Sequence, residues 1–260
     1  MTKTFTQRFS AIYVASALAL ASFALMSSGC ATNKAKDEAQ LHARIGTGLL
    51  QQARYPEALR ELLVAEKLDP KSPTIQNNLG LAFFMRERYQ TAADKLRNAL
   101  QLAPNYTEAR NNLARVLIEL EQYDQAIREL KIVLGDLTYT DPAKAYVNLG
   151  LAQFRKTDYE EARVTFSKAL KVNRENCLAQ TYYGRSLFEL AQFQAASNAL
   201  DNASVICREG GADEPKYFSG LAYYKLGKTS SAISRMEDVI KLSPDGKYAK
   251  KADELLRLMR

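Results

Sequence analysis

Residues that usually build catalytic or metal sites are scarce in this sequence. Among its 260 residues there are one histidine, His42, and three cysteines. A single histidine cannot form a histidine cluster for a metal ion, and there is no Ser/His/Asp set for nucleophilic catalysis. A glycine-rich phosphate-binding loop is also missing. We therefore predict a protein that is not an enzyme and uses no cofactor, metal or small-molecule substrate, with His42 facing solvent or a neighbouring helix.

Dense runs of positive charge are missing as well. Lys and Arg number 36 against 29 Asp and Glu, and the formal net charge of +7 is spread along the chain. Nucleic-acid-binding proteins gather such charge on one face or in one run. The pattern is typical of ordinary solubilising surface charge, and it predicts no nucleic-acid partner. With 12 Gly, 7 Pro and 47% hydrophobic residues, the chain can build a sizeable core.

The start of the chain has the layout of a secretory signal. Lys3 and Arg8 precede an apolar run over 11–26, which is followed by the small residues of "SSGC" ending at Cys30. This stretch resembles a bacterial lipobox, with Ser27 where that family usually has leucine. A plain signal peptide and an uncleaved membrane anchor are the alternatives.

The lipobox resemblance implies a destination for the protein. It predicts a signal peptide over 1–29, lipidation of Cys30 and a polar tether over 30–38 that leads into a helix. The residue after Cys30 is Ala31 and not the aspartate that retains many lipoproteins in the inner membrane. By this resemblance the protein is held by its N-terminal lipid at the periplasmic face of the outer membrane.

The rest of the chain is an internal repeat. An early small residue and a later alanine, always 12 positions apart, recur six times at intervals of 34 or 36 residues. The early residues are Gly46, Gly80, Ala114, Gly150, Gly184 and Gly220, and the later ones are Ala58, Ala92, Ala126, Ala162, Ala196 and Ala232. Each unit fits two amphipathic helices whose small residues let the two backbones approach closely.

This pattern is similar to the tetratricopeptide repeat. The resemblance implies an all-α solenoid of six repeats over 39–246, which start near 39, 73, 107, 143, 177 and 213. Stacked repeats bury a shared core, and the ends of such a stack need a cover. We expect the amphipathic segment 247–260 to be the C-terminal capping helix.

The two remaining cysteines lie in the fifth repeat. Its turn is centred near Gln192, and Cys177 and Cys207 are equally distant from that centre. Residues placed in this way face each other in an antiparallel helix pair, so the cysteines are candidates for a disulfide in an oxidising compartment. The alternative is two unlinked thiols that pack as small apolar side chains.

In this repeat family a partner-binding groove is lined by the first helix of each unit, notably by its second, fifth, ninth, twelfth and thirteenth residues. The ninth and twelfth places here supply the predicted groove residues Leu50, Leu81, Phe84, Arg115, Ile118, Leu151, Phe154, Arg185, Phe188, Leu221 and Tyr224. An apolar stripe with two arginines suits a peptide with large apolar side chains and some acid. The stripe could instead pack against the adjacent helix. A clamp for a peptide carboxylate is not matched, since Ala43, Thr47 and Glu108 stand at three of its places.

Signal, lipobox and repeats together resemble the pilotin lipoproteins of type IV pili, the PilF/PilW/Tgl group. The segment most similar to that group is 137–162, "LTYTDPAKAYVNLGLAQFRKTDYEEA". The resemblance implies that the protein accompanies the secretin subunit and promotes its assembly into an outer-membrane ring. Two rival functions stay open. One is a general envelope scaffold that docks cell-wall enzymes, and the other is an accessory factor for outer-membrane protein insertion.

Overall fold

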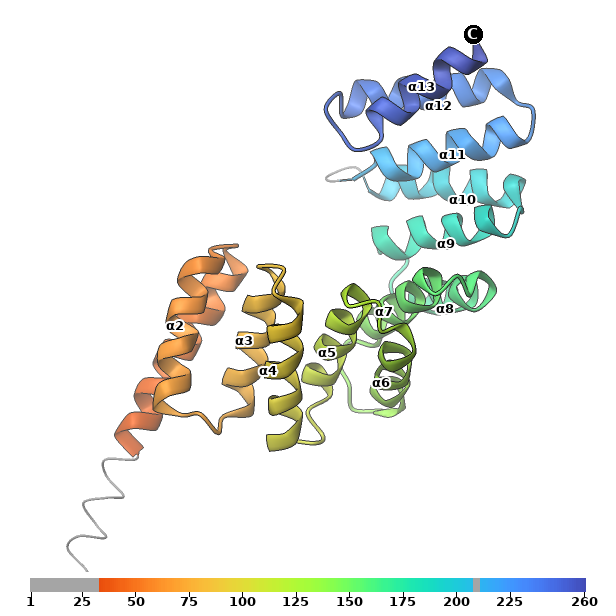
Figure 1. Ribbon diagram of the computed structural model, residues 1–260. Coiled ribbons are helices and arrows are strands. Elements are labelled where there is room, and N and C mark those ends of the chain that lie inside the picture. Colours follow the sequence, from red (N-terminus) through yellow and green to blue (C-terminus); the bar gives the residue numbers. More distant parts are fainter. Residues whose placement is uncertain (1–32, 208–210) are drawn as a thin grey trace, which may run out of the picture. The chain divides into compact units, whose positions relative to one another are not determined.

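The computed structural model describes residues 33–207 and 211–260, and within these ranges it is helical with no strand (Figure 1). The apolar segment, Cys30 and the start of the predicted tether lie outside the described residues. In the described part, no helix combines the length and the apolar character needed to cross a bilayer. The chain divides into two compact units, Met1–Pro104 and Asn105–Arg260.

The first unit holds two helical hairpins. Its elements are the helix over 33–51, α2 (Tyr55–Leu68), α3 (Pro73–Phe84) and α4 (Tyr89–Leu102). Residues 33–38, which the sequence predicts to be part of the tether, are already helical. The stretch is polar, which suggests a tether, but its Ala, Lys and Glu residues favour a helix even when they are exposed. The core of this unit includes Leu62, Ile75 and Leu79.

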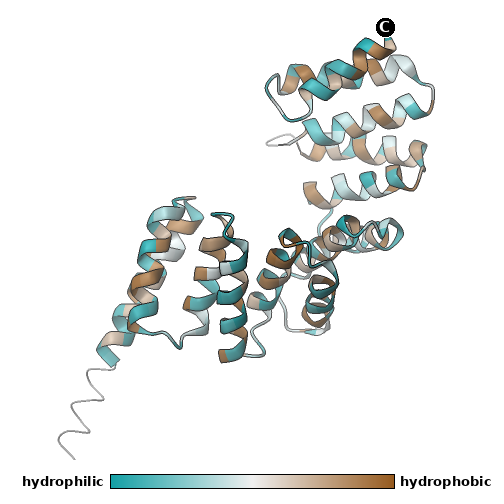
Figure 2. Ribbon diagram, viewed as in Figure 1, coloured by the Kyte–Doolittle hydropathy of each residue, from teal (hydrophilic) through white to brown (hydrophobic). Residues whose placement is uncertain are grey.

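The second unit holds four hairpins and a final helix. Its elements are α5 (Thr107–Glu119), α6 (Tyr123–Gly135), α7 (Pro142–Arg155), α8 (Tyr159–Val172), α9 (Cys177–Glu189), α10 (Phe193–Ile206), α11 (Asp213–Lys225), α12 (Thr229–Leu242) and α13 (Ala249–Met259). Figure 2 shows that the helices carry hydrophobic and hydrophilic residues side by side. This is the pattern of amphipathic helices that bury one face against a neighbour.

The first helix of several hairpins begins at residues that favour a helix start. Pro73 opens α3 and Pro142 opens α7, positions where proline costs no intrahelical hydrogen bond. The side chains of Ser72, Asp141 and Asn176 cap α3, α7 and α9 by accepting from backbone N–H groups in the first turn. The helix starts at 73, 107, 142, 177 and 213 therefore coincide, within one residue, with the repeat starts that the sequence pattern gives.

Each hairpin turns through one residue in the left-handed region. These residues are Ala53, Glu87, Glu121, Thr157, Ala191 and Gly227, with φ between 57° and 71°. Only the last hairpin has glycine there, the residue that adopts this conformation without a steric penalty. The other five show that packing of the two helices fixes the turn even when its residue is unfavourable. The repeat pattern did not reveal this feature.

The predicted close approach of the two helices is confirmed. A Cβ added at Gly80 would lie 2.5 Å from the Leu96 side chain, and one at Gly150 would lie 2.7 Å from the Phe166 ring. Gly184 meets Leu200 in the same way. The large side chain of the second helix thus fills the space that glycine leaves open on the first.

The final helix covers the end of the stack. Leu256 is buried, and Leu255 and Met259 pack against the same cluster, which also contains Met236 and Val239 of α12. This agrees with the expectation of a capping helix, although α13 itself begins at Ala249.

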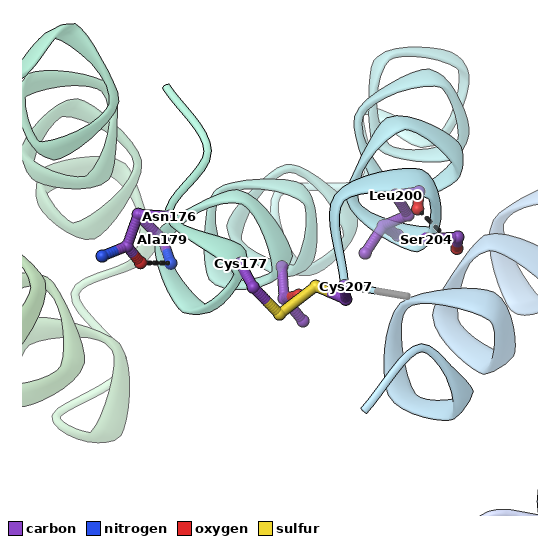
Figure 3. The surroundings of a disulfide bond; sticks show 7 residues. Asn176, Cys177, Ala179, Leu200, Ser204 and Cys207 are labelled. Carbon is purple, nitrogen blue, oxygen red and sulfur yellow. Dashed lines mark hydrogen bonds between the residues drawn. A yellow bond between two sulfur atoms is a disulfide. The ribbon is translucent and has the colours of Figure 1, made fainter. Parts of the chain in front are cut away.

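A disulfide joins Cys177 at the start of α9 to Cys207 at the end of α10 (Figure 3). The two Cα atoms are 5.1 Å apart, well within bridging range. The Cys207 side chain is buried, and its sulfur lies 3.7 Å from the Thr181 hydroxyl oxygen. The bond therefore closes the open end of the fifth hairpin, as the symmetry of the two positions about the turn predicts.

Candidate functional site

A hollow of about 600 Å³ opens on the first helices of three consecutive repeats in the second unit. It lies along α5, α7 and α9 and is bordered by the segments just before α7 and α9. Its lining comprises Arg115, Ile118, Glu119, Asp141, Ala143, Lys144, Val147, Asn148, Leu151, Arg155, Asn173, Asn176, Leu178 and Tyr182. The residues come from successive hairpins, so only the stacked form of the repeats creates this hollow.

The hollow combines an apolar part with polar and charged groups. Ile118, Val147, Leu151 and Leu178 supply aliphatic surface. Asn148 is buried, and its amide nitrogen donates to the Asn111 side-chain oxygen over 3.0 Å. The two side chains keep this orientation, because rotating either one would leave buried polar groups without a hydrogen bond, at a cost in free energy. The site can therefore accept an apolar side chain and a hydrogen-bonding backbone at once.

Positive charge in the hollow comes chiefly from two exposed arginines, Arg115 and Arg155. Lys144 also lines it, but its ammonium group lies 2.6 Å from a carboxylate oxygen of Glu108. Asp141 accepts from the backbone N–H of Lys144 and so belongs to the helix cap. A carboxylate on a bound segment would find guanidinium groups, the side chains best suited to hold it by paired hydrogen bonds.

Three of the eleven predicted groove residues, Arg115, Ile118 and Leu151, line this hollow. Arg185 does not line it. Its guanidinium carbon lies 4.8 Å from the ring centroids of Phe154 and Tyr182 and 4.3 Å from that of Phe218. It also forms a 2.7 Å ion pair with Glu214.

The Arg185 contacts connect α7, α9 and α11. Cation–π contacts and an ion pair of this kind hold successive repeats together. They engage the Arg185 guanidinium group in contacts within the protein. Tyr248 joins the same region by hydrogen bonding to Glu214 and stacking on Tyr217, with ring centroids 5.1 Å apart. Burial, and then the Glu214 charge and hydrogen bond, raise the pKa of the Tyr248 phenol well above its usual value.

The twelfth-place stripe mostly packs between helices. Phe154 is 7% exposed and belongs to the core cluster of α7, α8 and α9. Phe188 packs against Phe193 and Phe218, and Phe84 lies beside Tyr89. Leu50 is partly buried and packs against a neighbouring cluster, as does Leu221, which holds a ninth place. These contacts match the alternative that the stripe packs against the adjacent helix.

Two predicted groove residues, Tyr224 and Leu81, lie outside this hollow and are not buried. Tyr224 is among the exposed large apolar residues. Leu81 is partly buried on α3 and does not line the hollow on α5, α7 and α9.

Several lining residues were missed although the family places point to them. Arg155 and Glu119 are thirteenth residues of their repeats, Val147 is a fifth, and Lys144 and Leu178 are second residues. The predicted groove takes its residues only from the ninth and twelfth places. Using all five places would have recovered these side chains.

A smaller hollow of about 530 Å³ lies in the first unit. It is formed by the helix over 33–51 and α3, and its lining includes Arg44, Thr47 and Asn78. The Asn78 amide nitrogen donates to the Thr47 hydroxyl over 2.9 Å. Ala43 lines the same hollow, so two of the unmatched clamp positions lie here without a cationic side chain of their own.

His42 contacts a neighbouring helix, which was one of its two expected environments. Its Nδ1 lies 2.7 Å from a Glu61 carboxylate oxygen on α2. The described residues contain no group of three or more His, Cys, Asp or Glu side chains placed to hold a metal ion.

Comparison of the sequence with models of known protein families identifies the repeated hairpins. Family models, each described as tetratricopeptide repeat, match residues 44–107, 83–138, 143–176 and 219–246. Together these matches span most of the chain between 44 and 246. The chain is a tetratricopeptide-repeat protein. No curated protein sequence matches it significantly.

Solved structures of several other proteins share the fold. PilF of Pseudomonas aeruginosa is 21% identical with a TM-score of 0.70, over 86% of this chain and 99% of that one. PilW, described as a widely conserved type IV pilus biogenesis factor, is 16% identical with a TM-score of 0.76, over 82% and 97%. MamA of Desulfovibrio magneticus RS-1 is 25% identical with a TM-score of 0.57, over 66% and 96%. At these identities the similarity shows the fold.

Proposed function

We propose that this protein is an outer-membrane lipoprotein that assists assembly of the type IV pilus secretin by binding a segment of the secretin subunit. The observation that carries the proposal is the hollow on α5, α7 and α9, with its aliphatic surface and two exposed arginines. The similarity to PilF and PilW over nearly their whole lengths supports a role in pilus biogenesis. The lipobox ending at Cys30 supports an anchored protein.

The chemistry of the hollow defines the segment it would take. An extended or helical peptide can place one large apolar side chain against Ile118, Val147 and Leu151, and a nearby carboxylate against Arg115 or Arg155. Apolar burial would supply most of the affinity, and the arginines would select an acidic segment and speed its encounter. Holding a subunit in this way needs no catalytic group.

Reversing the two arginine charges tests this proposal. The Arg115→Glu, Arg155→Glu double variant should lose heat- and detergent-resistant secretin multimers in cells. Both side chains are exposed, so the fold should persist. Losing two charge-assisted contacts and adding repulsion should weaken binding of the secretin segment by at least about tenfold.

A matched control is available on the second helices of the same unit. Arg128 and Lys168 are also exposed and lie outside the hollow, and their replacement by Glu changes the net charge equally. This control should keep wild-type multimers. Wild-type multimer levels in the hollow variant would contradict the proposal, as would equal losses in both variants.

A further inference from the structure

The outward face of the first helix is unusually apolar. Leu41 and Ile45, four residues apart on one face of the helix over 33–51, are 48% and 43% exposed. They are the third and seventh residues of the first repeat. At the same places in the second repeat, Ile75 and Leu79 are buried in the core of the first unit. In the fourth repeat, Ala145 and Leu149 are buried as well.

These places are buried in internal repeats because the preceding hairpin covers them. Ile75 and Leu79 pack in a cluster with Leu62 and Ala65 of α2, which precedes them in the stack. Leu41 and Ile45 keep large aliphatic side chains although no described helix precedes theirs. The opposite end of the chain has its own cover, since α13 packs on α12. An exposed apolar end of a solenoid therefore calls for a partner surface.

Chain length brings this face close to the predicted lipid. Only Ala31 and Thr32 separate Cys30 from the helix over 33–51. Three residues span at most about 10 Å, and the helix adds about 12 Å from residue 33 to Leu41. A chain held in a bilayer at Cys30 thus carries Leu41 within reach of the surface of that bilayer.

We propose that Leu41 and Ile45 insert into the interface of the bilayer that holds the lipid anchor, so that the first repeat lies directly on the membrane. The inference rests on the lipidation of Cys30 in the proposed function. A lipoprotein's lipidated N-terminus carries more than one acyl chain and is a stable anchor by itself, so the added apolar contact would chiefly orient the first repeat on the membrane. Lys34 and Lys36 are balanced by Asp37 and Glu38, so the contact is apolar in character and should resist high salt.

The chain offers a clean optical test, because it contains no tryptophan. Leu41→Trp and, separately, Ile45→Trp place a unique reporter on this face of the mature lipidated full chain. The control is Val164→Trp, which lies on α8 and is 42% exposed in the native chain. The variants are reconstituted in phosphatidylethanolamine/phosphatidylglycerol vesicles, with and without lipids brominated on their acyl chains, after circular dichroism has verified folding and mass spectrometry the lipid.

Brominated chains should quench reporters at 41 and 45 about twofold or more, since side chains at an interface reach roughly 5–10 Å into the acyl boundary. The reporter at 164 should remain unquenched. An unquenched pair in verified lipidated protein would overturn the inference while leaving the anchor intact. Unmodified Cys30 would instead reject the anchor itself. If the tryptophan emission at 41 and 45 is blue-shifted but not quenched, and the protein is a dimer, the inference is wrong and a second copy of the chain covers this face.

Discussion

Replacing Phe154 by alanine should lower the free energy of unfolding by about 3–5 kcal/mol, the usual cost of removing a buried aromatic ring. Phe154 was a candidate for the partner groove, but its ring is buried between repeats. Its centroid lies 5.2 Å from that of Tyr159 and 5.0 Å from that of Tyr182, and the Arg185 guanidinium lies above it. The cavity would remove all three contacts at once.

Because solenoid repeats are stabilised mainly by their neighbours, the damage should centre on α7, α8 and α9. Urea denaturation gives the overall loss, and hydrogen exchange should show early opening of these helices. The matched control is Leu137→Ala, since Leu137 is 98% exposed and should change stability by less than about 0.5 kcal/mol. A Phe154→Ala variant as stable as this control would contradict the packing described here.

Removing the Cys177–Cys207 disulfide should lower stability by about 3–4 kcal/mol, as expected for cross-linked residues 30 positions apart. The bond restricts the unfolded chain and holds the start of α9 against the end of α10. The double Cys177→Ala, Cys207→Ala variant should therefore unfold at a lower urea concentration than the oxidised protein.

Reductant separates the cross-link from other effects of substitution. Adding a reducing agent should destabilise the native sequence by a similar amount and leave the double variant unchanged. A native protein with the same denaturation midpoint under oxidising and reducing conditions would contradict a stabilising role for this bond.

Features set within one hairpin could be predicted from sequence. The helix starts, the approach of Gly80 to Leu96 and the meeting of Cys177 with Cys207 depend on spacing along one antiparallel pair. Spacing of this kind is readable because a helix fixes which residues share a face. The same logic fails for 33–38, where composition suggested a tether and local helix preference prevailed.

Features set between repeats could not be predicted in this way. Arg185 occupies a groove place in the pattern, yet Phe218 and Glu214 from the next repeat surround its guanidinium group. Arg155 is exposed and lines the hollow. Which of the two arginines lines the hollow depends on aromatic and acidic side chains some thirty residues away, and a repeat consensus does not specify them.

Photo-crosslinking inside cells tests most directly whether the hollow on α5, α7 and α9 holds the secretin. A benzoylphenylalanine residue at position 178 would stand in the hollow, where Leu178 is 43% exposed. The same residue at position 164 replaces Val164, equally exposed on α8 and outside the hollow. We expect a crosslink to the secretin subunit from position 178 and none from position 164. Capture of another envelope protein at 178 without the secretin, or of the secretin at 164 alone, would contradict the proposed function.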